Sequence, residues 1–216
     1  MERKIVFLDI DGVLQPIGSQ ERFDHCHGEI EKSPMLAIYK SLEEKFGIDY
    51  SVYKQWDVAA VLFDWDKVAV SLLKLILNLT GSKIVLSSDW RLGGIQLMKD
   101  FFTLQGLEKY FIDVTRASES FFAEKMGLPE IDPEFVAEMK ARHKREYGDK
   151  AYLHWRTIEI FDWLHRNSDV KKWVAIDDMD LEGIGPNFVR TCDSLNEIDA
   201  EKCIRILSSR FKQKGT

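Results

Sequence analysis

Short apolar runs separated by polar stretches divide the chain into alternating strands and helices. Five runs rich in β-branched or aromatic residues are typical of β-strands, and their continuous apolar character indicates strands covered on both faces, as in a parallel sheet. Between the runs, apolar residues recur at helical spacing, for example at Val68, Leu72 and Ile76. This alternation predicts a doubly wound, Rossmann-like α/β domain. The predicted strands span Lys4–Leu8, Lys83–Leu86, Tyr110–Val114, Lys172–Ile176 and Asn187–Thr191.

Two segments interrupt the alternation, at about 15–63 and 116–152. The first contains a helical run, Pro34–Phe46, and an aromatic stretch around Tyr53 and Trp56; the second contains a predicted helix, Pro133–Tyr147. Excursions of this length are seldom structureless inside a compact domain. We therefore expect one domain over residues 1–216 that carries small helical cap insertions. The pattern leaves open which insertion covers the site.

The charge balance argues against a general affinity for nucleic acid or anionic membrane. The chain has 30 basic and 36 acidic side chains, a net charge of -6. Its three cysteines are too scattered for a disulfide framework, which suggests a reducing compartment. The most apolar stretch, Val68–Leu79, is interrupted by Lys74 and is shorter than the roughly 20 residues that a membrane span needs. We expect a cytoplasmic protein with no membrane partner.

Acidic residues follow the first and fourth predicted strands. Asp9 and Asp11 end the first strand and precede Gly12, which allows the chain to turn away from the sheet. Asp177 and Asp178 end the fourth strand. Ligands of open α/β sheets bind at the carboxyl ends of the strands, and carboxylate oxygens suit a hard cation such as Mg²⁺. A plain acidic turn is the alternative interpretation of either pair.

Hydroxyl groups and a cation complete the pattern. The second strand ends in Ser87 and Ser88, which can bind phosphate oxygens or simply cap the next helix. Arg156 begins the helix that leads into the fourth strand, so its guanidinium is expected near the same edge, although a solvated surface arginine is the alternative. Lys144 and Lys150 are the reserve candidates for the cation.

These motifs, in this order, resemble the phosphatase branch of the haloacid dehalogenase (HAD) superfamily. The run Ser-Ser-Asp-Trp-Arg, with Asp-Gly-Val-Leu before it, looks closest to the HAD domains of RNA-repair proteins of the Swiss-army-knife type. The resemblance implies a sheet ordered 5-4-1-2-3 and an Mg²⁺-dependent phosphohydrolase that cleaves phosphate monoesters through an aspartyl-phosphate. The family's third motif is commonly lysine, so Arg156 departs from it, although a guanidinium can also grip phosphate.

The resemblance also implies a role for each residue of the pattern. Asp9 would be the nucleophile and Asp11 the general acid and base. Ser87, Ser88 and Arg156 would bind phosphate. The metal ligands would be Asp9, Asp177, Asp178 and, through its backbone carbonyl, Asp11.

Several alternatives to a phosphohydrolase and to its substrate stay open. A phosphotransferase or mutase would keep every motif, and a non-catalytic module that binds phosphate or nucleic acid is a further reading. The expected partner is a phosphorylated small molecule or a nucleotide. A nucleic-acid end is a further candidate, because Trp90 and Trp155 flank the motifs and 140–145 is a basic run. Core packing and a solvated helix face are the ordinary explanations of these two features.

Overall fold

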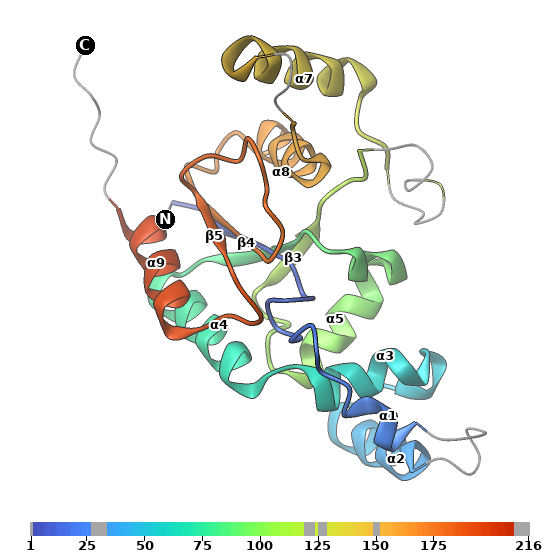
Figure 1. Ribbon diagram of the computed structural model, residues 1–216. Coiled ribbons are helices and arrows are strands. Elements are labelled where there is room, and N and C mark those ends of the chain that lie inside the picture. The colour runs from blue at the N-terminus through green and yellow to red at the C-terminus, as the bar shows by residue number, and fades with distance from the viewer. Residues whose placement is uncertain (1, 27–33, 119–123, 125–128, 149–151, 210–216) are drawn as a thin grey trace.

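The computed structural model describes residues 2–26, 34–118, 124, 129–148 and 152–209. Five parallel strands form one sheet in the order β3-β2-β1-β4-β5 (Figure 1). This confirms the predicted doubly wound α/β fold and its strand order. The strands lie within a residue of their predicted limits: β1 Lys4–Leu8, β2 Lys83–Leu86, β3 Phe111–Val114, β4 Lys172–Asp177 and β5 Phe188–Arg190.

Both faces of the sheet are covered, which explains the continuous apolar strands. Val6 and Leu8 of β1 belong to the core with α4 (Lys67–Thr80), α5 (Gly94–Leu104) and α9 (Glu197–Ser208). Ile5 and Phe7 face α8 (Trp155–Arg166) on the other side, where Phe7 meets the Trp163 ring edge-on at 5.4 Å. Successive residues of a strand point to opposite faces, so one short strand serves two cores.

The described part of segment 15–63, expected as the first insertion, forms small helices beside the sheet. These are α1 (Arg22–His25), α2 (Met35–Phe46), the 3-10 helix η2 (Tyr50–Val52), α3 (Gln55–Ala59) and the π-helix η3 (Ala60–Asp64). Arg22 joins α1 to the end of η3 through an ion pair with the buried Asp64 at 3.2 Å. Asp66 then begins α4, because its carboxylate accepts hydrogen bonds from the Val68 and Ala69 amides.

In the described part of segment 116–152, α7 (Pro133–Tyr147) is the helix predicted there. It packs against α8, with the Phe135 ring 5.3 Å from the ring of His165. Figure 1 shows α7 above α8 at one end of the molecule and α1, α2 and α3 at the other. Within the described residues, no helix combines the length and the apolar character that crossing a bilayer requires.

Candidate active site

The turn after β1 separates the first two acids. Asp9 stays in the sheet, since its amide donates to the Ile176 carbonyl at 3.0 Å, and its side chain is buried. Gly12 then adopts a left-handed conformation, with φ at +68°, and its carbonyl accepts a 2.6 Å hydrogen bond from the Thr191 hydroxyl. The chain thus turns back at the sheet edge and leaves Asp11 exposed.

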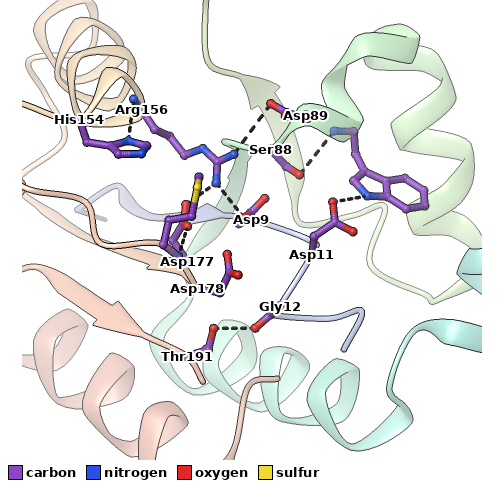
Figure 2. A network of polar contacts seen from close by, with 12 residues as sticks. Asp9, Asp11, Gly12, Ser88, Asp89, His154, Arg156, Asp177, Asp178 and Thr191 are labelled. Carbon is purple, nitrogen blue, oxygen red and sulfur yellow. Dashed lines mark hydrogen bonds and ion pairs between the residues drawn. The ribbon is translucent and has the colours of Figure 1, made fainter. Parts of the chain in front are cut away.

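The acids of β4 lie beside Asp9. Carboxylate oxygens of Asp9, Asp177 and Asp178 all fall within 4.8 Å of one another, and Figure 2 shows the three side chains grouped below Arg156. Asp177 is held by the Met179 amide, which donates to its Oδ1 at 2.9 Å. The side chain of Asp11 is not part of this three-carboxylate cluster.

Arg156 reaches into the same place from α8. Its Nη1 lies 2.7 Å from Oδ2 of Asp9 and 2.6 Å from Oδ2 of Asp177, so one guanidinium nitrogen bridges acids from two strands. Only 3% of the side chain is exposed, and Nε has no hydrogen-bond partner in the described part of the chain. His154 is the N-cap of α8, because its Nδ1 accepts a hydrogen bond from the Arg156 amide at 3.2 Å.

Negative charge exceeds positive charge in this buried cluster. Burial raises the pKa of Asp9 to about 7; the Arg156 charge opposes this shift, while the charge of Asp177 adds to it. Burial likewise raises the pKa of Asp177 against the opposing effect of Arg156. The cluster has three carboxylates and one guanidinium, which contacts two of them, and a divalent cation with oxygen ligands would neutralise the excess negative charge. The donor set therefore fits Mg²⁺.

One of the two serines at the end of β2 contacts the cluster. Ser88 hydrogen-bonds the Asp9 carboxylate, and this contact lowers the pKa of Asp9. Its Oγ also accepts from the Trp90 amide at 3.4 Å, so Ser88 caps the 3-10 helix η4 (Asp89–Gly93). The Ser87 hydroxyl is buried without a hydrogen-bond partner among the described residues. An unpaired buried hydroxyl costs about 1–3 kcal/mol, and a ligand oxygen would relieve that cost.

Asp11 stands beside a hollow of about 490 Å³ that we call the Asp11 hollow. Its Oδ2 accepts a 3.1 Å hydrogen bond from the indole Nε1 of Trp90. Although Asp11 is exposed, the protein around it removes part of its solvation, which raises the pKa of Asp11, and this hydrogen bond acts in the opposite direction. The rest of the lining comes from segment 15–63 and from η4 and α5: Val52, Tyr53, Lys54, Asp57, Asp89, Trp90, Gly93, Leu97 and Phe101.

A second buried arginine supports the site, and the sequence analysis missed it. Arg91 follows Trp90 in η4 and is fully buried, with Nη2 2.8 Å from a carboxylate oxygen of Glu159 and Nη1 donating to the Thr115 hydroxyl at 2.8 Å. Glu159 lies one helical turn after Arg156, so the pair joins η4 to the helix that carries the cation. The signal in the sequence was Glu159 itself, a lone acid between Ile158 and Ile160.

Lys144, one of the two reserve cations, does not join the cluster. Lys144 lies exposed on α7, at the end of the molecule away from the first insertion, and Lys150 falls outside the described residues. Trp155 lies beside the arginines instead, with its ring 4.9 Å from the Arg156 guanidinium and 5.9 Å from that of Arg91.

Comparison with known proteins gives one family. The model of the HAD domain in Swiss Army Knife RNA repair proteins matches residues 5–197. No curated protein and no solved structure matches the chain.

Proposed function

The chain belongs to the family of HAD domains in Swiss Army Knife RNA repair proteins, and on that basis we propose that it is a magnesium-dependent phosphatase acting on phosphate monoesters. Family membership supports a HAD-type phosphohydrolase or a related activity. The observation that carries the finer proposal is the cluster at the sheet edge, where oxygens of Asp9, Asp177 and Asp178 lie within 4.8 Å of one another and the buried guanidinium of Arg156 contacts the first two.

Asp9 is the proposed nucleophile. Its carboxylate is fixed by Arg156 at 2.7 Å and by Ser88, so it meets an incoming phosphorus without reorganising. An oxygen of Asp9 forms the new bond to phosphorus as the bond to the leaving oxygen breaks, which gives an aspartyl-phosphate. The unpaired Arg156 Nε and Ser87 hydroxyl are donors available for the oxygens of the transferring group.

Asp11 is the proposed proton donor and acceptor. It stands outside the metal cluster, at the wall of the Asp11 hollow, where the leaving group would depart. Protonated Asp11 gives its proton to the leaving oxygen. The resulting carboxylate then takes a proton from the water that attacks phosphorus, and the aspartyl-phosphate is hydrolysed with Asp9 released.

Asp9, Asp177 and Asp178 would hold the magnesium ion, joined by the backbone carbonyl of Asp11 as the family resemblance implies. When bound, the ion offsets the excess negative charge and allows a phosphate dianion to approach a carboxylate. Arg156 keeps the two strand-end acids together before any ion arrives, because it contacts both of them.

The first insertion is the proposed lid. The Asp11 hollow takes part of its wall from that segment, including Tyr53, Lys54 and Asp57, whereas no residue of the described part of 116–152 lines it. The substrate would be a phosphorylated small molecule or nucleotide whose leaving group enters the hollow. Because the family occurs in RNA repair proteins, the phosphorylated end of an RNA is a further candidate.

A substrate panel tests the proposal. We expect Mg²⁺-dependent phosphate release from at least one member of a panel of phosphorylated metabolites and of 3′- or 5′-phosphorylated oligonucleotides. Asp9→Asn should abolish turnover, while Asp193→Asn, at an exposed acid that is not part of the cluster, should keep it. Full activity of Asp9→Asn would mean a different nucleophile. No turnover by the wild type on any ester, with phosphate still bound, would favour a binding module.

A further inference from the structure

We infer that Trp90 is a positioning residue that holds the Asp11 carboxylate at the wall of the Asp11 hollow, an inference that rests on the proposed function. The indole Nε1 donates to Oδ2 of Asp11 at 3.1 Å, across 79 positions of sequence. Asp11 lies exposed on a turn, so a fixed partner limits the orientations of its side chain. In Figure 2, Asp9 lies between Arg156 and Asp11, so Asp11 lies on the side of Asp9 away from Arg156.

The Trp90 ring is itself held by an aromatic cluster. It meets the ring of Trp65 at 5.8 Å and that of Phe101 at 6.1 Å, both edge-on at 71°. Its backbone is fixed as well, because Ser88 caps η4 and the next residue, Arg91, is anchored by its buried ion pair with Glu159. A ring held on these sides keeps its N–H directed at Asp11 at little entropic cost.

The hydrogen bond also decides which Asp11 oxygen carries the proton. An indole nitrogen is a donor only, so the oxygen that it contacts accepts and the acidic proton belongs on the other oxygen, Oδ1. As the bond from phosphorus to the leaving oxygen breaks, the electron pair stays on that oxygen and the Oδ1 proton moves to it. Because Trp90 and Asp11 line the same hollow, the proton is presented to the leaving group.

Trp90→Phe tests this role, because it keeps a ring for Trp65 and Phe101 and removes the N–H. The measurement is the rate of leaving-group release in a single turnover, over aryl and alkyl phosphates of increasing leaving-group pKa. We expect a loss of about tenfold on the poorest leaving groups and a much smaller loss on activated aryl esters, because the latter need little protonation.

Trp65→Phe is the matched control. It makes the same substitution in the same aromatic cluster, but the Trp65 Nε1 is buried with no hydrogen-bond partner among the described residues. This variant should follow the wild type over the whole series. In an Asp11→Asn background, Trp90→Phe should cause no further loss on poor leaving groups, because the two residues act as one unit.

The outcomes separate this inference from the proposed function. Equal losses by Trp90→Phe on good and poor leaving groups, or losses that add to those of Asp11→Asn, would overturn it and leave Trp90 as a wall of the hollow. A wild type that releases no leaving group from any ester would instead remove the proposed function. A selective loss in Trp90→Phe alone supports the positioning role.

Discussion

At the residue scale, Gly12 shows how closely the two acidic strand ends approach. Its φ of +68° lies in the left-handed region, which costs other residues about 1–2 kcal/mol. A Cβ at this position would stand 2.5 Å from the Cβ of Asp178, so the backbone of the first turn lies directly against a proposed metal ligand. Glycine at this position therefore serves both the turn and the spacing of the carboxylates.

We expect Gly12→Ala to weaken Mg²⁺ binding about tenfold or more, because the added methyl group displaces Asp178. Isothermal titration with Mg²⁺ measures the effect. Gly81→Ala is the control. The φ of Gly81 is +69° and open space surrounds the new Cβ, so this variant has a similar backbone strain but does not contact a proposed metal ligand. An unchanged Mg²⁺ affinity in Gly12→Ala would show that Asp178 does not bind the ion.

At the scale of elements, a buried ion pair connects η4 to α8. Arg91 and Glu159 have side chains 1% and 2% exposed and lie 2.8 Å apart. The Ser118 amide donates to the other Glu159 oxygen at 3.0 Å, which brings the end of β3 into the same contact. Where Glu159 is ionised, removing one partner of such a pair typically costs about 3–5 kcal/mol, because the other charge stays buried alone. The Arg91–Glu159 ion pair thus fixes η4, with Trp90 and its capping residue Ser88, to α8, which carries Arg156.

Glu159 should make stability depend on pH. Burial raises its pKa from an ordinary value of 4.5 to about 7, although Arg91 opposes the shift. Between these values the folded state keeps a proton that the unfolded state has released. Rising pH therefore lowers the free energy of unfolding by up to about 1.4 kcal/mol per pH unit, and the contribution is fully lost above about pH 7.

Urea unfolding from pH 5 to pH 8 measures this effect. Relative to Glu159→Gln, which cannot titrate, the wild type should lose stability as the pH rises. Glu44→Gln, an exposed substitution on α2, should follow the wild type. If the wild type instead became more stable relative to Glu159→Gln as the pH rises, the ion pair with Arg91 would outweigh the cost of burial.

At the scale of the whole molecule, the described helices of the two inserted segments lie at opposite ends (Figure 1). Only the first contributes described residues to the Asp11 hollow, through η2, α3 and the loop between them. Tyr53, in the part of the lining that this segment supplies, is anchored to α5, because its hydroxyl donates a hydrogen bond to Asp100 at 2.5 Å. Under the proposed function, a wall fixed to α5 in this way would select leaving groups by shape.

We expect Lys54→Ala to raise KM severalfold for a small phosphorylated substrate, with a smaller change in kcat, because Lys54 lines the hollow and has no proposed part in the bond-breaking steps. Lys140→Ala on α7 is the matched change in the second segment and should leave both constants as in the wild type. Steady-state kinetics on one substrate compare the two. A KM effect from Lys140 alone would make the second segment the lid.

The fold was predictable because its signals are local. Each strand is a short apolar run, a parallel sheet brings all strand carboxyl ends to one edge, and the order of β1 and β4 then places Asp9 beside Asp177. Helical spacing predicted α4 as well, although it did not identify the buried face: Leu73 and Leu77 are buried, whereas Val68 and Leu79 are more than 60% exposed.

The contacts that join distant segments were decided only by the tertiary structure. Trp90 meets Asp11 and Arg91 meets Glu159 because η4, the β1 turn and α8 pack together, and no periodicity in the chain encodes which side chains then face each other. The same holds for the insertion that lines the hollow, since both segments have helical patterns and similar lengths. Composition and spacing specify the elements, while packing of their particular surfaces specifies the neighbours.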